Sequence, residues 1–492
     1  MPVNKWHSTV TRRDFMKALG FGAAGLGALA ATSPVFHDLD EVLSAPESNW
    51  SRPWWVKENE IPNMTQEMDW NIYDQFDYDT NGVNASKVAM FGAEHVAAQN
   101  QNRSNREAQC IRDNVPGYDF RGRGLYDALT REGIDSGFLG YRSVKTYKQY
   151  GQRANPPIDV PRYQGTPEEN VKMLRVCAKL RGAAVVGACE VDSRVKKMFF
   201  KRMSGKYSLF EEREDGEVRS NALVCPNKAK YVLTLTVPMS EELIRRMPTA
   251  LAEGAVMMGY SYGRILNAGL SNYLWMLGYL GLGAGDNTWK VHSGMAVYSG
   301  CGEASRMHQN YISPELGAMQ RCFAIVTDLP LAPTNPVDFG IWQYCRKCKK
   351  CAQICPPIAL DRENEDPSWE SPYFPFNQPG QNCYPFSFAL CSDWWSTIST
   401  GCGMCMASCP FSHKQFGTVH DMVNILVSKT SFFNGFLKNL DDVFGYGMYE
   451  GVYQIGVDPM DYVNVTQEMA DFYNKWWDEE PKIHGMYNTT KV

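Results

Sequence analysis

Residues 345–356 read CRKCKKCAQICP, four cysteines spaced C-x2-C-x2-C-x3-C and followed by proline. Three thiolates on one such loop can reach three corners of a cubane iron–sulfur cluster, and the fourth points to a neighbouring cluster. Zinc sites also use C-x2-C pairs, but zinc gives no reason for the closing C-x3-C-P. The stretch therefore predicts a unit that holds two [4Fe–4S] clusters, similar to bacterial ferredoxins.

A second cysteine run lies downstream. Residues 402–410 read CGMCMASCP, which is one cysteine short of the full pattern. Cys391 is the preferred source of the missing thiolate, and Cys383 is the alternative. Because the last cysteine of each run crosses to the other cluster, we expect the first cluster on Cys345, Cys348, Cys351 and Cys409, and the second on Cys355, Cys391, Cys402 and Cys405.

The first 45 residues have the pattern of an export signal. Residues 11–17 read TRRDFMK, and a short Gly/Ala-rich apolar run follows at 18–31. This is typical of a twin-arginine signal peptide rather than a membrane span. Twin-arginine export carries folded proteins, which suits clusters that must be assembled in the reducing cytoplasm.

Composition excludes other classes of function. The chain has 492 residues with 49 Lys and Arg against 54 Asp and Glu, and no basic block that would favour nucleic acid. No apolar run in the body of the chain is long enough for a transmembrane helix. Nine of the 15 cysteines fall between Cys345 and Cys409, which favours metal ligation over a disulfide framework.

The region upstream of the cysteines alternates predicted helices and strands. Thr166, Pro167 and Glu169 predict a helix start with a capping box. Apolar runs predict strands at 183–188, 231–238 and 322–330, with helices from 240 and over about 260–278. We expect an α/β domain. No G-x-G-x-x-G motif follows a predicted strand, and the P-loop and H-E-x-x-H motifs are absent from the sequence. The Gly-rich residues 281–285 are better suited to backbone lying against a flat cofactor.

Several motifs together resemble one family, the respiratory reductive dehalogenases, which are the cobalamin-dependent enzymes of organohalide respiration. They extend over about residues 231–413, in addition to the signal. The motifs are Tyr262-Gly263-Arg264, Leu277-Gly278-Tyr279, Gly285-Asp286-Asn287-Thr288, Gly302-Glu303-Ala304-Ser305-Arg306, Thr327-Asp328-Leu329-Pro330-Leu331 and the two cysteine runs.

The resemblance implies a fold and cofactors. It implies an α/β (α+β) nitroreductase-like domain that binds cobalamin base-off, with an appended two-cluster ferredoxin-like domain. No D-x-H-x-x-G motif occurs, and the eight histidines (7, 37, 95, 292, 308, 413, 420 and 484) form no ligand-spaced pair. Each histidine is expected to be structural. The expected divisions are a signal at 1–45, an N-terminal region at 46–165, the cobalamin-binding catalytic domain at 166–330, the ferredoxin-like domain at 331–425 and a C-terminal segment at 426–492 that packs on the catalytic domain.

The resemblance also implies a reaction, R–X + 2e⁻ + H⁺ → R–H + X⁻, with electrons passing from the first cluster to the second and then to cobalt. It assigns Tyr262 as the proton donor, with Arg321 beside it to stabilise the phenolate and Asn287 completing the site; Arg306 is the alternative to Arg321. Gly285, Asp286, Asn287 and Thr288 are expected to contact the cofactor. Aromatic candidates for an apolar substrate pocket are Trp275, Trp289, Trp342, Trp394 and Trp395.

Two other functions compete with this interpretation. One is an enzyme similar to epoxyqueuosine reductase, which acts on transfer RNA. The other is an exported ferredoxin-type electron carrier without catalysis. The expected partners of a dehalogenase are a small organohalide, either a chlorinated ethene or a chlorinated aromatic, a small integral-membrane anchor protein, and a membrane electron donor such as a quinol or a hydrogenase chain. We expect a peripheral location on the outer face of the cytoplasmic membrane.

Overall fold

The computed structural model describes residues 52–119, 121–123, 126–127, 148, 152, 155–283, 289–412, 418–443 and 466–478. The expected signal peptide at 1–45 and the expected cofactor contacts at 285–288 lie outside these residues.

The central sheet has four strands in the order β2-β7-β9-β8. They are β2 (Val185–Glu190), β7 (Tyr231–Pro238), β9 (Gln320–Thr327) and β8 (Leu282–Gly283). Every neighbouring pair is antiparallel. The alternation of helices and strands along the chain therefore does not produce the parallel sheet of an α/β fold, and the α+β description is the correct one.

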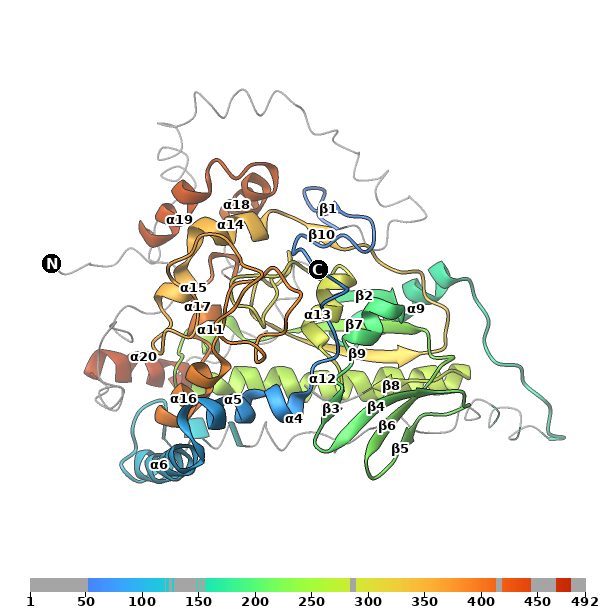
Figure 1. Ribbon diagram of the computed structural model, residues 1–492, viewed down its shortest axis with the longest axis horizontal. Coiled ribbons are helices and arrows are strands. Elements are labelled where there is room, and N and C mark those ends of the chain that lie inside the picture. The colour runs from blue at the N-terminus through green and yellow to red at the C-terminus, as the bar shows by residue number, and fades with distance from the viewer. Residues whose placement is uncertain are drawn as a thin grey trace.

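Helices cover both faces of this sheet. The long α12 (Ala250–Leu277) lies beneath it, and α13 (His292–Tyr298) packs on β7 and β9 (Figure 1). Alternate residues of β9 divide between the two faces, since Phe323 and Ile325 share a core cluster with α12, whereas Ala324 and Val326 share one with α13. Burial on both faces explains why the strands read as continuous apolar runs.

One glycine explains how closely α12 approaches the sheet. A Cβ atom built on Gly263 would lie 1.7 Å from the ring of Phe323 on β9. No larger residue fits between α12 and β9 at this point. The middle residue of the Tyr262-Gly263-Arg264 motif is therefore a packing requirement.

The local helix signals behave as predicted. Helix α9 (Pro167–Leu180) begins with Thr166 as N-cap, and the reciprocal capping box with Glu169 is formed. Ser240 caps α11 (Glu241–Ile244). The long helix begins ten residues earlier than predicted, at Ala250 instead of about 260, with Thr249 as its cap. The predicted strand at 231–238 coincides with β7.

Two smaller sheets flank the central one. The first has the order β3-β4-β6-β5 and comprises β3 (Arg202–Met203), β4 (Lys206–Glu211), β6 (Ala222–Pro226) and β5 (Glu217–Val218). The second pairs β1 (Lys57–Glu58) with β10 (Val337–Asp338). The short helix α4 (Tyr78–Asn81) packs on β3, and the short helix α10 (Ser193–Lys197) comes directly before β3 in the chain.

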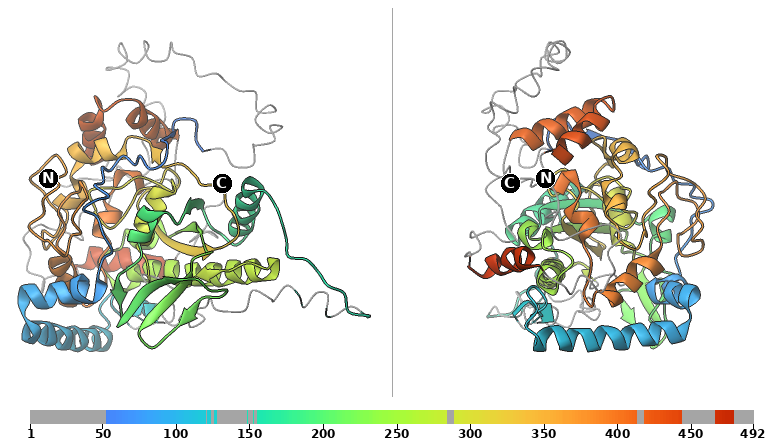
Figure 2. Two further views of the ribbon diagram at one scale, coloured as in Figure 1. Left: turned by 45° about the vertical axis from the view of Figure 1, so that its right-hand side comes forward. Right: turned by 90° about the vertical axis from the view of Figure 1, so that its left-hand side faces the viewer.

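The cysteine runs lie in a helical layer beside α11 and α12. This layer contains α14 (Ile341–Cys348), α15 (Lys350–Gln353), α16 (Phe388–Thr397), α17 (Met404–Ala407) and the 3-10 turn η2 (Pro410–Ser412). Helices α5 (Val83–Phe91) and α6 (Ala93–Arg112) pack against α16 (Figure 2). The last described helices are α18 (Thr418–Lys429), α19 (Asn434–Val443) and α20 (Gln467–Asp478).

One apolar core joins this layer to the long helix. Leu251 and Ala255 of α12 belong to the same buried cluster as Cys345, Cys348 and Cys409. The cysteine loops therefore pack in the same core as α12. Within the described ranges, no helix is both long and apolar enough to span a bilayer.

Candidate active site

A cavity of about 660 Å³ lies between the central sheet and the helical layer. Its size is within the range of small-molecule and cofactor sites. Methionine and aromatic side chains form a large part of the wall and provide an apolar and adaptable surface. These side chains are Met64, Met68, Tyr73, Phe76, Tyr78, Met198, Phe200, Met257, Tyr260, Met307, Tyr311, Phe376, Phe386, Phe388, Trp394, Trp395, Met404 and Met406.

The structure brings the second predicted cysteine set together at this cavity. Cys355, Cys391, Cys402 and Cys405 all line it. They come from the end of the first run, from α16, and from the second run around α17. Cys383 is buried in a β-bridge with Ser368 and is not among the described lining residues. The geometry thus favours Cys391 over Cys383.

The first predicted set surrounds a separate small cavity of about 20 Å³. Cys345, Cys348, Cys351 and Cys409 line this space together with Arg306. The two cysteine runs therefore exchange one residue each, as the crossover spacing predicts. Cys355 belongs by sequence to the first loop and by position to the second set, so one short loop connects both.

Burial raises the pKa of every thiol in both sets. Burial raises the pKa of Cys348 and of Cys405 to about 12, so these thiols would keep their protons unless a metal displaced them. Among the described residues, no His, Cys, Asp and Glu side chains converge on a position for a single ion. A cubane distributes its thiolates over separate iron atoms, which fits the two four-cysteine cavities better than zinc does.

Arg306 has a structural position beside the first set. It is fully buried, and its guanidinium donates hydrogen bonds to the carbonyl oxygens of Cys345 (3.1 Å), Asp361 (2.9 Å) and Glu365 (3.1 Å). The guanidinium also stacks 3.9 Å from the ring centroid of Tyr384. Arg306 is therefore not the alternative to Arg321 that the sequence allowed, because it does not reach the large cavity.

Glu303 of the same motif holds the N-terminus of α14, the helix that contains Cys345. Its carboxylate accepts hydrogen bonds from the backbone N–H groups of Phe339 (2.6 Å), Ile341 (3.2 Å) and Trp342 (3.4 Å), at the N-terminus of α14. Burial raises the pKa of Glu303 to about 7, against the opposing effect of these N–H donors. The Gly302–Arg306 motif thus holds the first cysteine loop from both ends.

The tyrosine beside Arg321 differs from the prediction. The Arg321 guanidinium carbon lies 4.8 Å from the ring centroid of Tyr260, and both residues line the cavity. Tyr262 lies outside the described lining, and its hydroxyl donates to the Arg181 carbonyl oxygen at 2.5 Å. Residues two apart on a helix differ by about 200° in direction, so the two tyrosines cannot share a face. The expectation that Tyr262 neighbours Arg321 is wrong.

The cavity face of α12 is visible as a repeat in the sequence. Glu253, Val256, Met257 and Tyr260 line the cavity at helical spacing.

Arg321 also acts on the cysteines: burial raises the pKa of Cys405, and the Arg321 charge opposes that rise. The buried Nε of Arg321 has no hydrogen-bond partner in the described structure. Arg321 therefore lies between the second cysteine set and Tyr260.

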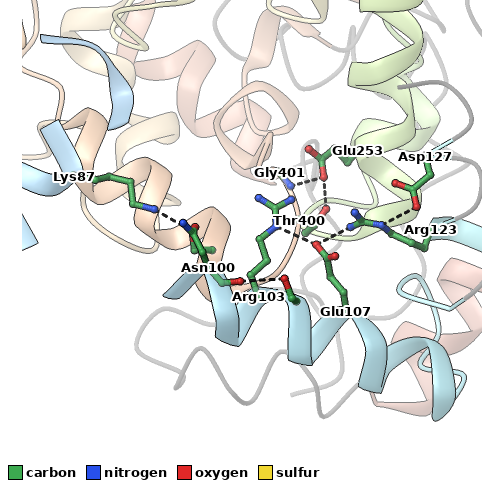
Figure 3. Close-up of polar contacts among 11 residues, drawn as sticks. Lys87, Asn100, Arg103, Glu107, Arg123, Asp127, Glu253, Thr400 and Gly401 are labelled. Carbon is green, nitrogen blue, oxygen red and sulfur yellow. Dashed lines mark hydrogen bonds and ion pairs between the residues drawn. The ribbon is translucent and has the colours of Figure 1, made fainter. Parts of the chain in front are cut away.

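Glu253 fixes the loop that leads into Cys402. Its carboxylate accepts hydrogen bonds from the Thr400 hydroxyl (2.6 Å) and the Gly401 backbone N–H (2.5 Å) (Figure 3). A Cβ on Gly401 would lie 2.4 Å from this carboxylate, so only glycine allows the contact. Beside it, Glu107 pairs with Arg103 and Arg123. A buried polar network therefore positions the second cysteine run.

Other predicted residues divide between the cavity and the core. Trp394 and Trp395 line the cavity, whereas Trp275, Trp289 and Trp342 are buried elsewhere in the described chain. Asn287, with Gly285, Asp286 and Thr288, lies outside the described residues, so its role stays a prediction.

The polar residues of the cavity wall that sequence reasoning missed include Lys290, His292 and His308. The Nδ1 of His308 donates a hydrogen bond to the Tyr384 carbonyl oxygen at 3.1 Å, and burial lowers the pKa of His308 to about 4. The two ring nitrogens of His292 have no partner among the described residues, so this histidine is not the satisfied structural residue that was expected. The only available signal was that Lys290 and His292 directly follow the Gly-rich segment.

The family model described as reductive dehalogenase subunit matches residues 51–331 of the chain. This chain belongs to the reductive dehalogenase family. The match covers the central sheet, both of its helical faces and the Tyr260–Arg321 pair. It confirms the family predicted from the sequence motifs.

Curated relatives agree over most of the chain. The chloroethene reductive dehalogenase of Dehalococcoides mccartyi (strain VS) is 29% identical, over 98% of this chain and 99% of that protein. The tetrachloroethene reductive dehalogenase of Sulfurospirillum multivorans is 30% identical over 47% of this chain and 45% of that protein. The predicted reaction class, reductive removal of halogen from carbon, is confirmed by these relatives.

Solved structures share the fold. A reductive dehalogenase whose structure suggests a mechanism for B12-dependent dehalogenation matches with a TM-score of 0.56 and 15% identity, over 84% of this chain and 54% of that one. The catabolic reductive dehalogenase NpRdhA, in complex with 3-bromo-4-hydroxybenzoic acid, also has a TM-score of 0.56, over 80% of this chain and 49% of that one. This chain thus spans about half the length of the solved structures it matches.

Proposed function

We propose that this reductive dehalogenase replaces a halogen of a small organohalide by hydrogen in the 660 Å³ cavity, with cobalamin and two [4Fe–4S] clusters as cofactors. One observation carries the proposal. The second cysteine set opens into the same cavity that contains the Tyr260–Arg321 pair. A source of electrons and a source of protons therefore face one space.

The cysteines define the electron path. Cys345, Cys348, Cys351 and Cys409 would hold one cluster, and Cys355, Cys391, Cys402 and Cys405 the other. The loop from Cys351 to Cys355 connects the two sets within five residues. A corrinoid, when bound, supplies the cobalt chemistry that cleaves the carbon–halogen bond. The apolar cavity wall excludes water from the reacting carbon.

Tyr260 would supply the proton, in place of the Tyr262 expected from the motif. A tyrosine has an ordinary pKa of ~10, and a nearby guanidinium stabilises the phenolate left after proton transfer. Arg321 cannot serve as the acid itself because its guanidinium keeps its proton in proteins. Tyr260 is therefore the acid, and Arg321 the group that makes proton loss easier.

The substrate class follows from the relatives and the cavity wall. Relatives that match over most of the chain are named for chloroethene and trichloroethene. The methionine-rich wall suits a small apolar molecule. We therefore propose a chlorinated ethene in preference to a chlorinated aromatic.

The cellular setting extends this proposal. The twin-arginine pattern at 11–17 supports export, with a peripheral position on the outer face of the cytoplasmic membrane. A small integral-membrane anchor protein and a quinol or hydrogenase chain would then complete the respiratory path. The antiparallel sheet with helices on both faces is the basis for the nitroreductase-like description, and the two cysteine sets are the basis for the ferredoxin-like one.

The test combines cofactor content with turnover. Anaerobically purified protein should contain one corrinoid and about eight iron atoms with equal sulfide per chain. With reduced viologen as electron source, it should release chloride from a panel of chloroethenes faster than from chlorobenzenes. Clusters without corrinoid and without halide release would instead indicate an electron carrier.

A further inference from the structure

Lys290 is a buried cation without a partner on the cavity wall. Its side chain is 1% exposed, and its Nζ has no hydrogen-bond partner among the described residues. The ring centroid of Trp289 lies 4.8 Å from Nζ. Burying an unpaired ammonium is costly, so a site that keeps one is expected to use it for a ligand.

The backbone holds Lys290 in place. Phe200 N–H donates to the Trp289 carbonyl and Val291 N–H donates to the Met198 carbonyl, each at 2.8 Å. These bonds form a short antiparallel bridge next to β3 and α13. The backbone position of Lys290 on the cavity wall is therefore fixed by the fold.

His292 adds a second unpartnered polar group beside it. The imidazole is 5% exposed, and both ring nitrogens lack hydrogen-bond partners among the described residues. Burial and the adjacent Lys290 charge together hold the pKa of His292 well below its ordinary value. The neutral ring can donate one hydrogen bond and accept another. The pair therefore presents a cation and a hydrogen-bond donor to the cavity.

The charge of the cavity favours an anion. Lys290 and Arg321 both line it, and Glu253 is the one carboxylate among its described lining residues. Glu253 is already engaged by Thr400 and Gly401 at the end near the second cysteine set. Burial lowers the pKa of Lys290 to about 7, which is what an ammonium shows when its anionic partner is missing.

We infer that Lys290 and His292 form an anion-binding subsite that takes the phosphodiester of the cobalamin nucleotide tail. This inference rests on the proposed corrinoid-dependent function. The leaving halide is the other anion that the chemistry could supply. Arg321 lies near Cys405 and beside Tyr260, where substrate must meet electrons and a proton, so we assign Lys290 and His292 to the cofactor.

The test compares two corrinoids that differ in this group. Cobinamide lacks the nucleotide and the linkage through phosphodiester, whereas cobalamin has both. The full chain, with reconstituted clusters and no corrinoid, is titrated with each and followed by corrin absorbance. Lys290→Met should weaken cobalamin binding by roughly 10- to 100-fold, the loss of one charged hydrogen bond, and leave cobinamide binding unchanged.

Stability of the corrinoid-free protein provides a second readout. Lys290 has no internal partner among the described residues, so Lys290→Met should not lower the melting temperature. The matched control is Lys87→Met, which removes a buried lysine outside the cavity that is hydrogen-bonded to Ser396 at 3.0 Å. This control should lower the melting temperature and leave the ratio of the two affinities unchanged. Lys290→Gln provides a second variant if Met prevents folding.

Each contrary outcome has a separate meaning. Equal losses for cobalamin and cobinamide, or no loss for either, would overturn the inference while the proposed function stands. Relief of chloride or bromide product inhibition in Lys290→Met, with cobalamin affinity unchanged, would assign the subsite to the halide and overturn it as well. A wild-type chain that binds neither corrinoid would refute the proposed function itself.

Discussion

Replacing Tyr260 by phenylalanine tests the proton donor. The substitution removes one oxygen atom and keeps the ring that packs against Arg321 at 4.8 Å, so the cavity shape and the cation–π contact remain. Loss of a general acid typically costs 10²- to 10⁴-fold in rate, which corresponds to about 3–5 kcal/mol of transition-state stabilisation. We expect kcat to fall by this factor and KM to change little.

Tyr262→Phe is the matched control two residues away on the same helix. It removes the hydrogen bond to the Arg181 carbonyl oxygen, which is worth about 0.5–1.5 kcal/mol of stability, and it should leave kcat unchanged. Halide release with reduced viologen measures both variants, and iron and corrinoid contents confirm that each site is intact. Full turnover in Tyr260→Phe, or its loss in Tyr262→Phe alone, would refute the assignment made from the cavity geometry.

Further predictions concern the cysteine sets and their supports. Cys391→Ser should lose about half of the iron, that of the second cluster, whereas Cys383→Ser should keep all of it; equal iron in both would contradict the chosen ligand. Arg306→Lys cannot maintain three carbonyl hydrogen bonds and should lower stability by about 2–4 kcal/mol, with loss of the first cluster before the second in a thermal melt followed by absorbance. Glu303 has a pKa raised by burial to about 7 in the folded chain, against an ordinary 4.5, so the folded state binds the extra proton and stability falls as pH rises from about 4.5 through 7. In Glu303→Gln, the change in unfolding free energy between about pH 4.5 and 7 should be about 3 kcal/mol smaller than in the wild type. Equal changes in the two proteins, measured by denaturation at each pH, would contradict the assignment.

The Gly302–Arg306 motif illustrates how a recognisable sequence can have a role different from the expected one. As sequence, it marked the family and offered Arg306 as a candidate for the site. In the fold, Glu303 holds the start of α14 and Arg306 holds the carbonyls around Cys345. Both act on the first cysteine loop, so these two residues of the motif support that loop and do not line the large cavity.

Sequence reasoning succeeded where the physics is local. The capping box at Thr166 and Glu169 depends on residues three apart, and β7 depends on one unbroken apolar run. The cysteine sets were also predictable, because the spacing within each run limits which thiols can meet on one cluster. The resemblance to the family added the reaction class, which no local pattern contains.

Other features depend on which segments meet in three dimensions. The strands were predicted, but their antiparallel order requires knowing how α12 returns the chain to the sheet. The choice between Tyr260 and Tyr262 depends on the rotation of α12 about its axis relative to the cavity. The absence of partners for Lys290 and His292 is likewise a property of the packed surroundings.

The sequence by itself therefore determined most of the grouping of the cysteines into two sets, the helix caps, the main strands and the family, since each depends on spacing along the chain. The tertiary structure decided which tyrosine faces Arg321, which cysteine set opens into the cavity, and which buried lysine on its wall lacks a hydrogen-bond partner. The physical reason is that the cavity is assembled from segments between residues 64 and 406. Its chemistry is set by contacts between distant residues, which no local pattern records.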